Sequence, residues 1–156
     1  MPEVSGYAKA VQLLAARPHF RAELAAKLAR RGYPEAEAEA ALDRLAREGL
    51  LDDLKTARDF VAHRRESRGE GRRRLAAELA RRGAPAAAVD EALADLTPDD
   101  DLAAAQEAAA VWARRGGTDP RALARHLERK GFGRRAIVTV LNEHGGGDLW
   151  EEAGED

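Results

Sequence analysis

A pattern of two leucines, a cation and a glycine occurs three times in this chain at nearly constant spacing. The copies align on Gly32, Gly83 and Gly131, which are 51 and 48 residues apart. Each glycine has leucine eight and four residues before it, Arg or Lys immediately before it, and apolar residues six and ten residues after it. Leucines four residues apart, then a cation and a glycine, predict an amphipathic helix with a left-handed C-cap. A period of about 50 residues predicts repeated helical units.

Each copy is expected to form three helices, and no segment alternates with a period of two for long enough to predict a strand. The first helices are expected at 8–16, 54–65 and 102–114, the second at 20–31, 72–82 and 120–130, and the third at 35–48, 86–96 and 134–143. The predicted fold is all-α, with three tandem three-helix, helix-turn-helix-like repeats at 8–53, 54–101 and 102–145. A unit of this size is marginal alone, so neighbouring units should pack into an elongated curved array.

Two tails should flank the repeats, an N-terminal tail at 1–7 and an acidic tail at 146–156, in which Trp150 is the one residue expected to be able to dock. Charged residues make up 35% of the chain, hydrophobic residues 44% and aromatic residues 4%, so the core must consist mainly of Ala, Leu and Val. The chain has no cysteine, which excludes disulfides and is compatible with the cytoplasm. Without a long apolar run, neither a signal peptide nor a membrane span is expected.

The net charge of −2 conceals a strong separation of charge along the chain. Residues 64–82 carry eight cations and three anions, and residues 114–135 carry eight cations and two anions. Residues 90–107 carry seven anions and no cation. The third helices of the first two repeats are acidic, and phosphates would repel them. A helix-turn-helix that inserts its last helix into the major groove is therefore disfavoured for those two repeats.

Two clusters of cations are candidate contact regions. The first comprises Arg64, Arg65, Arg68, Arg72, Arg73 and Arg74, around a turn that contains Gly69 and Gly71; the second comprises Arg121, Arg125, Arg129, Lys130, Arg134 and Arg135. Such clusters are typical of surfaces that bind phosphates or acidic proteins. The alternative is that both are solvated faces, with some of the first cluster paired to Glu66, Glu70 and Glu78. Binding is favoured for the first cluster because its cations outnumber these local carboxylates.

Two details of these clusters bear on what they could bind. Arg134 and Arg135 begin a helix, where the helix dipole disfavours cations, so either they meet an external anion or they point into solvent. No aromatic residue accompanies the first cluster, which disfavours a site that stacks the bases of a single strand.

Residues for catalysis or metal binding are scarce. His19, His63, His126 and His144 are scattered and are expected to be surface or boundary residues. The acidic run at 99–101 is explained as a helix start, and the Gly-Glu-Gly run at 69–71 lacks the preceding strand and following Lys-Ser or Lys-Thr of a phosphate-binding loop. We therefore expect no enzyme activity, no metal and no cofactor.

With these repeats in view, the chain resembles the RecX regulatory protein family over about residues 8–142. The resemblance rests on the Gly-Leu-Leu-Asp-Asp run at 49–53, on Ala57 and Phe60 with Arg64 or Arg65, and on Gly71, Glu78, Leu79 and Gly83. It also includes Glu23, Leu24, Lys27, Leu28 and Gly32 upstream, and Leu123, Leu127, Lys130, Gly131, Phe132 and Ile137 downstream.

The resemblance implies a negative regulator of the RecA recombinase that has a role in DNA repair and the SOS response. Such a protein would bind in the groove of RecA filaments on single-stranded DNA, and would inhibit filament extension, ATP hydrolysis and strand exchange. The implied partners are the RecA filament and single-stranded DNA, with double-stranded DNA as a further possibility and no membrane; we expect a cytoplasmic monomer. The alternatives are a general DNA-binding or transcriptional regulatory protein and a purely structural helical-repeat adaptor.

Overall fold

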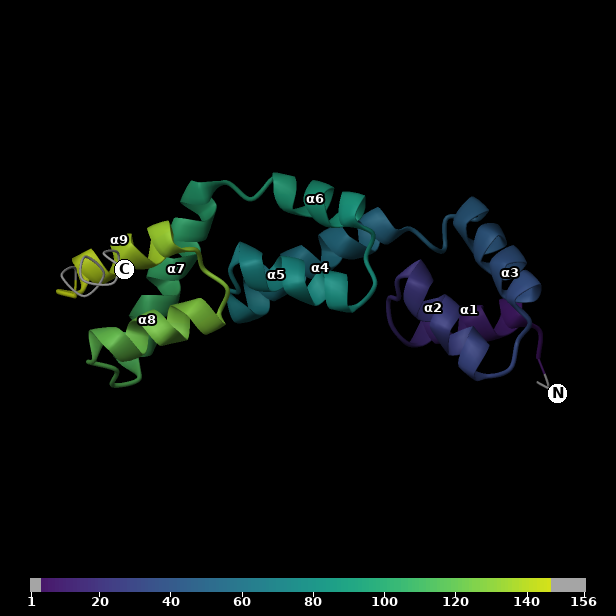
Figure 1. Cartoon of the computed structure of the whole chain (residues 1–156), viewed down its shortest axis with the longest axis horizontal. Coiled ribbons are helices and arrows are strands. Elements are labelled where there is room, and N and C mark those ends of the chain that lie inside the picture. The colour runs from purple at the N-terminus through teal and green to yellow at the C-terminus, as the bar shows by residue number, and fades with distance from the viewer. Residues whose placement is uncertain (1–3, 147–156) are drawn as a thin grey trace, which may run out of the picture. The chain divides into compact units, whose positions relative to one another are not determined.

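The structure is a computed structural model, described here for residues 4–146 (Figure 1). Over these residues the chain forms nine helices and no strand, which confirms the predicted all-α class. The helices are α1 (Gly6–Ala16), α2 (Arg21–Arg30), α3 (Glu35–Arg47), α4 (Asp53–Arg68), α5 (Arg72–Arg81), α6 (Ala86–Ala94), α7 (Pro98–Arg114), α8 (Pro120–Arg129) and α9 (Arg134–Glu143). Trp150 and the rest of the predicted acidic tail from residue 147 onward lie outside the described residues.

Helix α7 begins four residues earlier than predicted, because Thr97 and Asp100 cap it reciprocally. The hydroxyl of Thr97 accepts a hydrogen bond from the backbone N–H of Asp100 (3.1 Å), and the Asp100 carboxylate accepts one from the backbone N–H of Thr97 (2.9 Å). This capping box satisfies two of the N–H groups that a helix start leaves without partners.

The repeat positions have the structure that the sequence predicts for them. Gly32, Gly83 and Gly131 all have positive φ angles of 85–93°, as a left-handed C-cap requires. The leucines four and eight residues before each glycine are buried in all three copies. These residues therefore end the second helices and hold them against the interior.

The first compact unit comprises the described residues up to Phe60 together with Glu78–Ala92. Its core is formed where α1, α2 and α3 pack on one another, with Leu24, Leu28, Leu42 and Leu45 fully buried. Because aromatic residues are scarce, much of this core consists of leucine and alanine, as the composition predicts.

One buried polar residue of the first unit, His19, corrects the expectation that all four histidines lie at the surface or its boundary. His19 is only 2% exposed. Its Nδ1 lies 2.9 Å from the carbonyl oxygen of Arg17, and its Nε2 lies 2.7 Å from Nζ of Lys27. A carbonyl oxygen can only accept and an ammonium can only donate, so the ring is neutral and carries its proton on Nδ1. Two hydrogen bonds thus make burial of this polar ring acceptable.

The second compact unit comprises Val61–Ala77 and the described residues from Leu93 onward. Helices α7, α8 and α9 pack on one another around Leu123, Leu127, Phe132, Ile137 and Leu141. The division between the two units runs through α4 and α5. The predicted repeat boundaries and the predicted elongated array stay predictions.

Candidate nucleic-acid interface

All twelve cations of the two predicted contact regions belong to the second compact unit. The first region comes from the end of α4, the following turn and the start of α5. The second comes from α8 and the start of α9. Residues far apart in the sequence are therefore candidates for a single surface.

The two regions are joined through the backbone where the α4–α5 turn meets the α8–α9 turn. The N–H of Gly71 donates to the carbonyl oxygen of Lys130 (2.7 Å), and the N–H of Arg73 donates to that of Gly131 (3.1 Å). A Cβ atom added to Gly71 would lie 2.5 Å from the carbonyl carbon and oxygen of Gly131. Gly71 is thus needed for close approach of two main chains.

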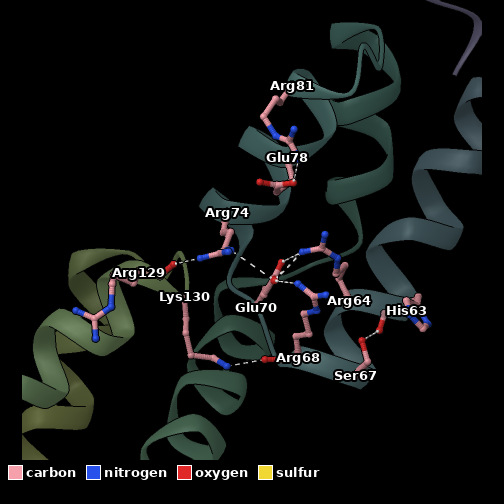
Figure 2. Close-up of polar contacts among 10 residues, drawn as sticks. All are labelled: His63, Arg64, Ser67, Arg68, Glu70, Arg74, Glu78, Arg81, Arg129 and Lys130. Atoms are coloured by element: carbon pink, nitrogen blue, oxygen red, sulfur yellow. Dashed lines mark hydrogen bonds and ion pairs between the residues drawn. The ribbon is translucent and has the colours of Figure 1, made fainter. Parts of the chain in front are cut away.

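Side chains of both regions cross the same junction, as Figure 2 shows. Nη1 of Arg74 donates to the carbonyl oxygen of Arg129 (2.8 Å), and Nζ of Lys130 donates to the carbonyl oxygen of Arg68 (2.6 Å). Each region therefore holds the backbone of the other, and the cations around the junction keep a defined spacing.

A buried carboxylate, Glu70, organises three of the arginines around this junction (Figure 2). It accepts two hydrogen bonds from Nη1 of Arg64, at 2.8 and 3.1 Å. Nε of Arg74 and Nη1 of Arg68 lie 3.5 and 3.9 Å from the same carboxylate. The side chains of Arg64 and Glu70 are only 11% and 5% exposed, whereas those of Arg74 and Arg68 are 43% and 59% exposed. Arg64 is therefore structural, and the other two present their positive charge to solvent.

Two further arginines of the first region have partners within the unit. Nη1 of Arg65 donates to the carboxylate of Asp101 (2.6 Å), and both side chains are largely buried. Arg72 donates to the carbonyl oxygens of Leu93, in the last turn of α6, and of Leu96, just after that helix. The direct binding role of Arg64, Arg65 and Arg72 stays a prediction.

Besides Arg72, eight cations of the two regions are exposed, with side chains on four helices, and two of these eight, Arg68 and Arg74, also contact Glu70. Arg121, Arg125 and Arg129 recur every four residues along α8, and Leu123 and Leu127 of the same helix are buried. These arginines therefore form one exposed stripe. The other exposed cations are Arg68 on α4, Arg73 and Arg74 on α5, and Arg134 and Arg135 on α9.

Sequence reasoning missed three residues next to this surface: Trp112 and Arg115 at the end of α7, and His126 on α8. They line a cavity of about 720 Å³ together with Arg68, Arg74 and Lys130. The expectation that no aromatic side chain accompanies the first region is therefore wrong at Trp112. No local pattern predicts this, because α7 meets the α4–α5 turn only through tertiary packing.

Burial is the main cause that lowers the pKa values of two groups at this cavity, and neighbouring cations add to it. Burial lowers the pKa of the Lys130 amine below its ordinary value; Glu70 acts in the opposite direction, and Arg74 and Arg115 lower the pKa further. Burial also lowers the pKa of His126, and nearby Lys130, Arg129 and Arg115 add to that effect. An anion bound here would relieve repulsion among these cations.

Residues 4–146 also bear on metal binding and on membrane spanning. No group of three or more His, Asp or Glu side chains in this part of the chain is arranged to hold a metal ion. None of the helices described above is both long and apolar enough to cross a membrane.

Comparisons with known proteins match most of the chain. A family model described as the first three-helix domain of RecX matches residues 7–45, and a model of the second three-helix domain matches residues 52–93. The regulatory protein RecX of Mycobacterium ulcerans is 37% identical over 145 residues, which cover 89% of this chain and 84% of that protein. The regulatory protein RecX of Mycobacterium tuberculosis is 36% identical over 148 residues, which cover 89% and 85%.

A solved structure with a similar fold is also that of a RecX protein. The crystal structure of RecX from Lactobacillus salivarius superimposes with a TM-score of 0.79 over 92% of this chain and 95% of that one, at 22% identity. At 22% identity, this similarity is evidence for the fold only. The family models and the mycobacterial relatives together show that this chain belongs to the RecX family of regulatory proteins.

Proposed function

We propose that this protein is a non-catalytic, cytoplasmic negative regulator of the RecA recombinase. In this proposal it binds in the groove of RecA filaments on single-stranded DNA and inhibits filament extension, ATP hydrolysis and strand exchange. Membership of the RecX family supports the regulatory role. The observation that carries the contact with the filament is the backbone junction that brings both basic regions into one unit.

The exposed stripe on α8 is the part of this surface that can be changed with least effect on the fold. Arg121 and Arg125 are exposed, and neither donates a side-chain hydrogen bond within the described residues. A strand that crosses this stripe would have phosphates within reach of both guanidinium groups. Binding of phosphates by cations releases condensed counterions and so depends steeply on salt.

The test titrates the protein into preformed RecA filaments on single-stranded DNA while ATP turnover is followed. We expect inhibition by the unmodified chain and a large loss of potency in the double variant Arg121→Gln, Arg125→Gln. The matched control is Arg30→Gln, Arg47→Gln, which removes two exposed cations from α2 and α3 of the first unit. For direct binding to single-stranded DNA, the α8 variant should flatten the slope of log affinity against log salt by about 1.4, at about 0.7 for each phosphate contact.

If folded unmodified protein leaves ATP turnover unchanged at saturating concentration, the proposed function is wrong. If both double variants lose potency equally, the α8 stripe is not a specific contact.

A second candidate, a general DNA-binding or transcriptional regulator, is favoured by one observation. Arg134 and Arg135 are exposed at the start of α9, the position from which a recognition helix contacts base edges. Against it, the first turn of α3 is acidic, with Glu35 and Glu37. A transcriptional regulator of this kind would prefer one duplex sequence over others. A competition experiment, in which a specific and a random duplex compete for binding to the protein, therefore distinguishes this candidate from a regulator of RecA.

A further inference from the structure

The cavity in the second unit combines cations with an aromatic ring. Its volume of about 720 Å³ lies in the range of about 300–1,000 Å³ that is usual for small-molecule sites. Its walls come from the α4–α5 turn, the second half of α7, and α8 with the lysine that follows it. Arg68, Arg74, Arg115 and Lys130 line it beside the indole of Trp112.

The carboxylates at this cavity neutralise only part of its positive charge, because Glu70, which lies 3.5 Å from Arg74 and 3.9 Å from Arg68, is shared with a closer cation. Glu70 already accepts both hydrogen bonds from Arg64, which lies outside the lining. Glu107 is 3.3 Å from Arg114, another cation outside the lining. The side chain of Lys130 donates to a backbone carbonyl, which leaves its full charge at the wall. A ligand with negative charge is therefore favoured.

The indole of Trp112 is held in a fixed position. A Cβ atom at Gly117 would lie 2.3 Å from Cδ2 and Cε2, the two carbons that fuse the rings. The backbone of Gly117 therefore covers one face of the indole. The N–H of Gly117 also donates to the carbonyl oxygen of Trp112 (3.2 Å), which fixes this arrangement. Trp112 also packs against the buried core of α7, α8 and α9, and the part of the ring that lines the cavity is the part on which a flat ligand can stack.

We propose that this cavity takes one unstacked nucleotide of a DNA single strand, with its base stacked on Trp112 and its phosphate held by Arg68, Arg115 and Lys130. The inference rests on the proposed function for the identity of the strand, and adds a site to it. Glu66 and Glu107 at the cavity would repel a phosphate and an acidic peptide alike, so they do not distinguish the two ligands. The aromatic ring favours nucleic acid over an acidic protein segment, because a base can stack on it and a carboxylate side chain cannot.

The chain permits a direct spectroscopic test, because it has only two tryptophans, Trp112 and Trp150. In the full-length variant Trp150→Phe, Trp112 is the sole tryptophan, and its fluorescence reports on the cavity alone. We expect a single-stranded oligothymidylate to quench this emission in parallel with the anisotropy of a labelled oligonucleotide. A duplex of equal length, poly-glutamate and free thymidine monophosphate are titrated separately to identify the source of any quenching.

Two pairs of variants sharpen the test. Trp112→Leu should weaken oligothymidylate binding roughly 5- to 150-fold, the effect of removing one base–aromatic stack, while Trp112→Phe keeps most of the affinity. Arg115→Gln should weaken quenching more than Arg114→Gln, which removes an equal charge one residue away but outside the lining. If Trp112→Leu does not fold, the quenching experiment and Trp112→Phe still decide the matter.

Several results would overturn the site. One is unchanged Trp112 emission when anisotropy shows that the strand is saturated; another is equal quenching by strand and duplex. Quenching by poly-glutamate but not by the strand would assign the cavity to a protein partner instead, and quenching only by the free nucleotide would exclude the strand. In each case inhibition of RecA ATP turnover is measured on the same protein. Retained inhibition shows that the cavity proposal fails while the proposed function stands.

Discussion

Replacement of Glu70 by glutamine should destabilise the protein by about 3 kcal/mol. The side chain keeps its shape, but the negative charge that accepts both hydrogen bonds from the buried Arg64 is lost. Removal of one partner from a buried ion pair costs about 3–5 kcal/mol, and we expect the lower end because glutamine keeps one carbonyl oxygen as an acceptor. The pairs with Arg68 and Arg74 add less than about 1 kcal/mol each, because both arginines are well exposed.

The assay is urea denaturation of the full chain followed by far-UV circular dichroism, with Glu66→Gln as the matched control. Glu66 is exposed in the same segment of the chain, so this control should change the free energy of unfolding by no more than about 0.5 kcal/mol. Hydrogen exchange at the amide of Gly71 gives a second readout, which should speed up in Glu70→Gln as the turn loosens. Equal stability of the two variants would refute the view that Glu70 organises the turn.

Three further predictions concern the backbone, a helix cap and a buried ring. Gly71→Ala should lower the free energy of unfolding by about 2–3 kcal/mol, because its Cβ atom would meet backbone atoms. Gly69→Ala should lower it by about 1 kcal/mol, because Gly69 has a left-handed backbone but open space around it. Urea denaturation compares the two variants. Thr97→Ala should cost about 1 kcal/mol in the same assay through loss of the α7 cap. Burial lowers the pKa of His19, so the unfolded chain binds more protons at this group. The contribution of His19 to the free energy of unfolding should be fully present above about pH 6.5 and should fall below it, and urea denaturation as a function of pH should show a flatter dependence for His19→Gln.

The fold class followed from the sequence because its signals are local. Leucines at helical spacing and a glycine after a cation specify a helix and its end without help from the rest of the chain, and Leu79 and Gly83 have the predicted burial and backbone. The capping residues Thr97 and Asp100 also carry such a local signal, but the predicted helix start placed the acidic run before α7 instead of within its first turn.

The site was predictable only as a set of charges. The count of cations against nearby carboxylates treated Glu66, Glu70 and Glu78 alike, yet only burial makes Glu70 the centre of an arginine cluster. The partner of Arg65, Asp101, is distant in the sequence, as is the wall that contains Trp112. Such contacts depend on how helices pack, which the periodicity of one segment does not encode.

The buried state of His19 escaped prediction for the same reason. A lone histidine in a turn gives no sign of its environment, and the two groups that satisfy its ring come from Arg17 and Lys27, on either side of the turn. Only the folded turn brings a carbonyl oxygen and an ammonium to opposite nitrogens of one ring.

The division of the chain between its two units has a consequence for its synthesis on the ribosome. The polypeptide leaves the first unit after Phe60, returns to it at Glu78, and leaves it again after Ala92. Residues 61–77 therefore emerge well before the rest of the second unit, which includes the buried Leu141. At about 5–20 residues per second this nascent segment waits several seconds for its packing partners. Translation speed across the last third of the message should thus influence how much of the protein reaches its native state.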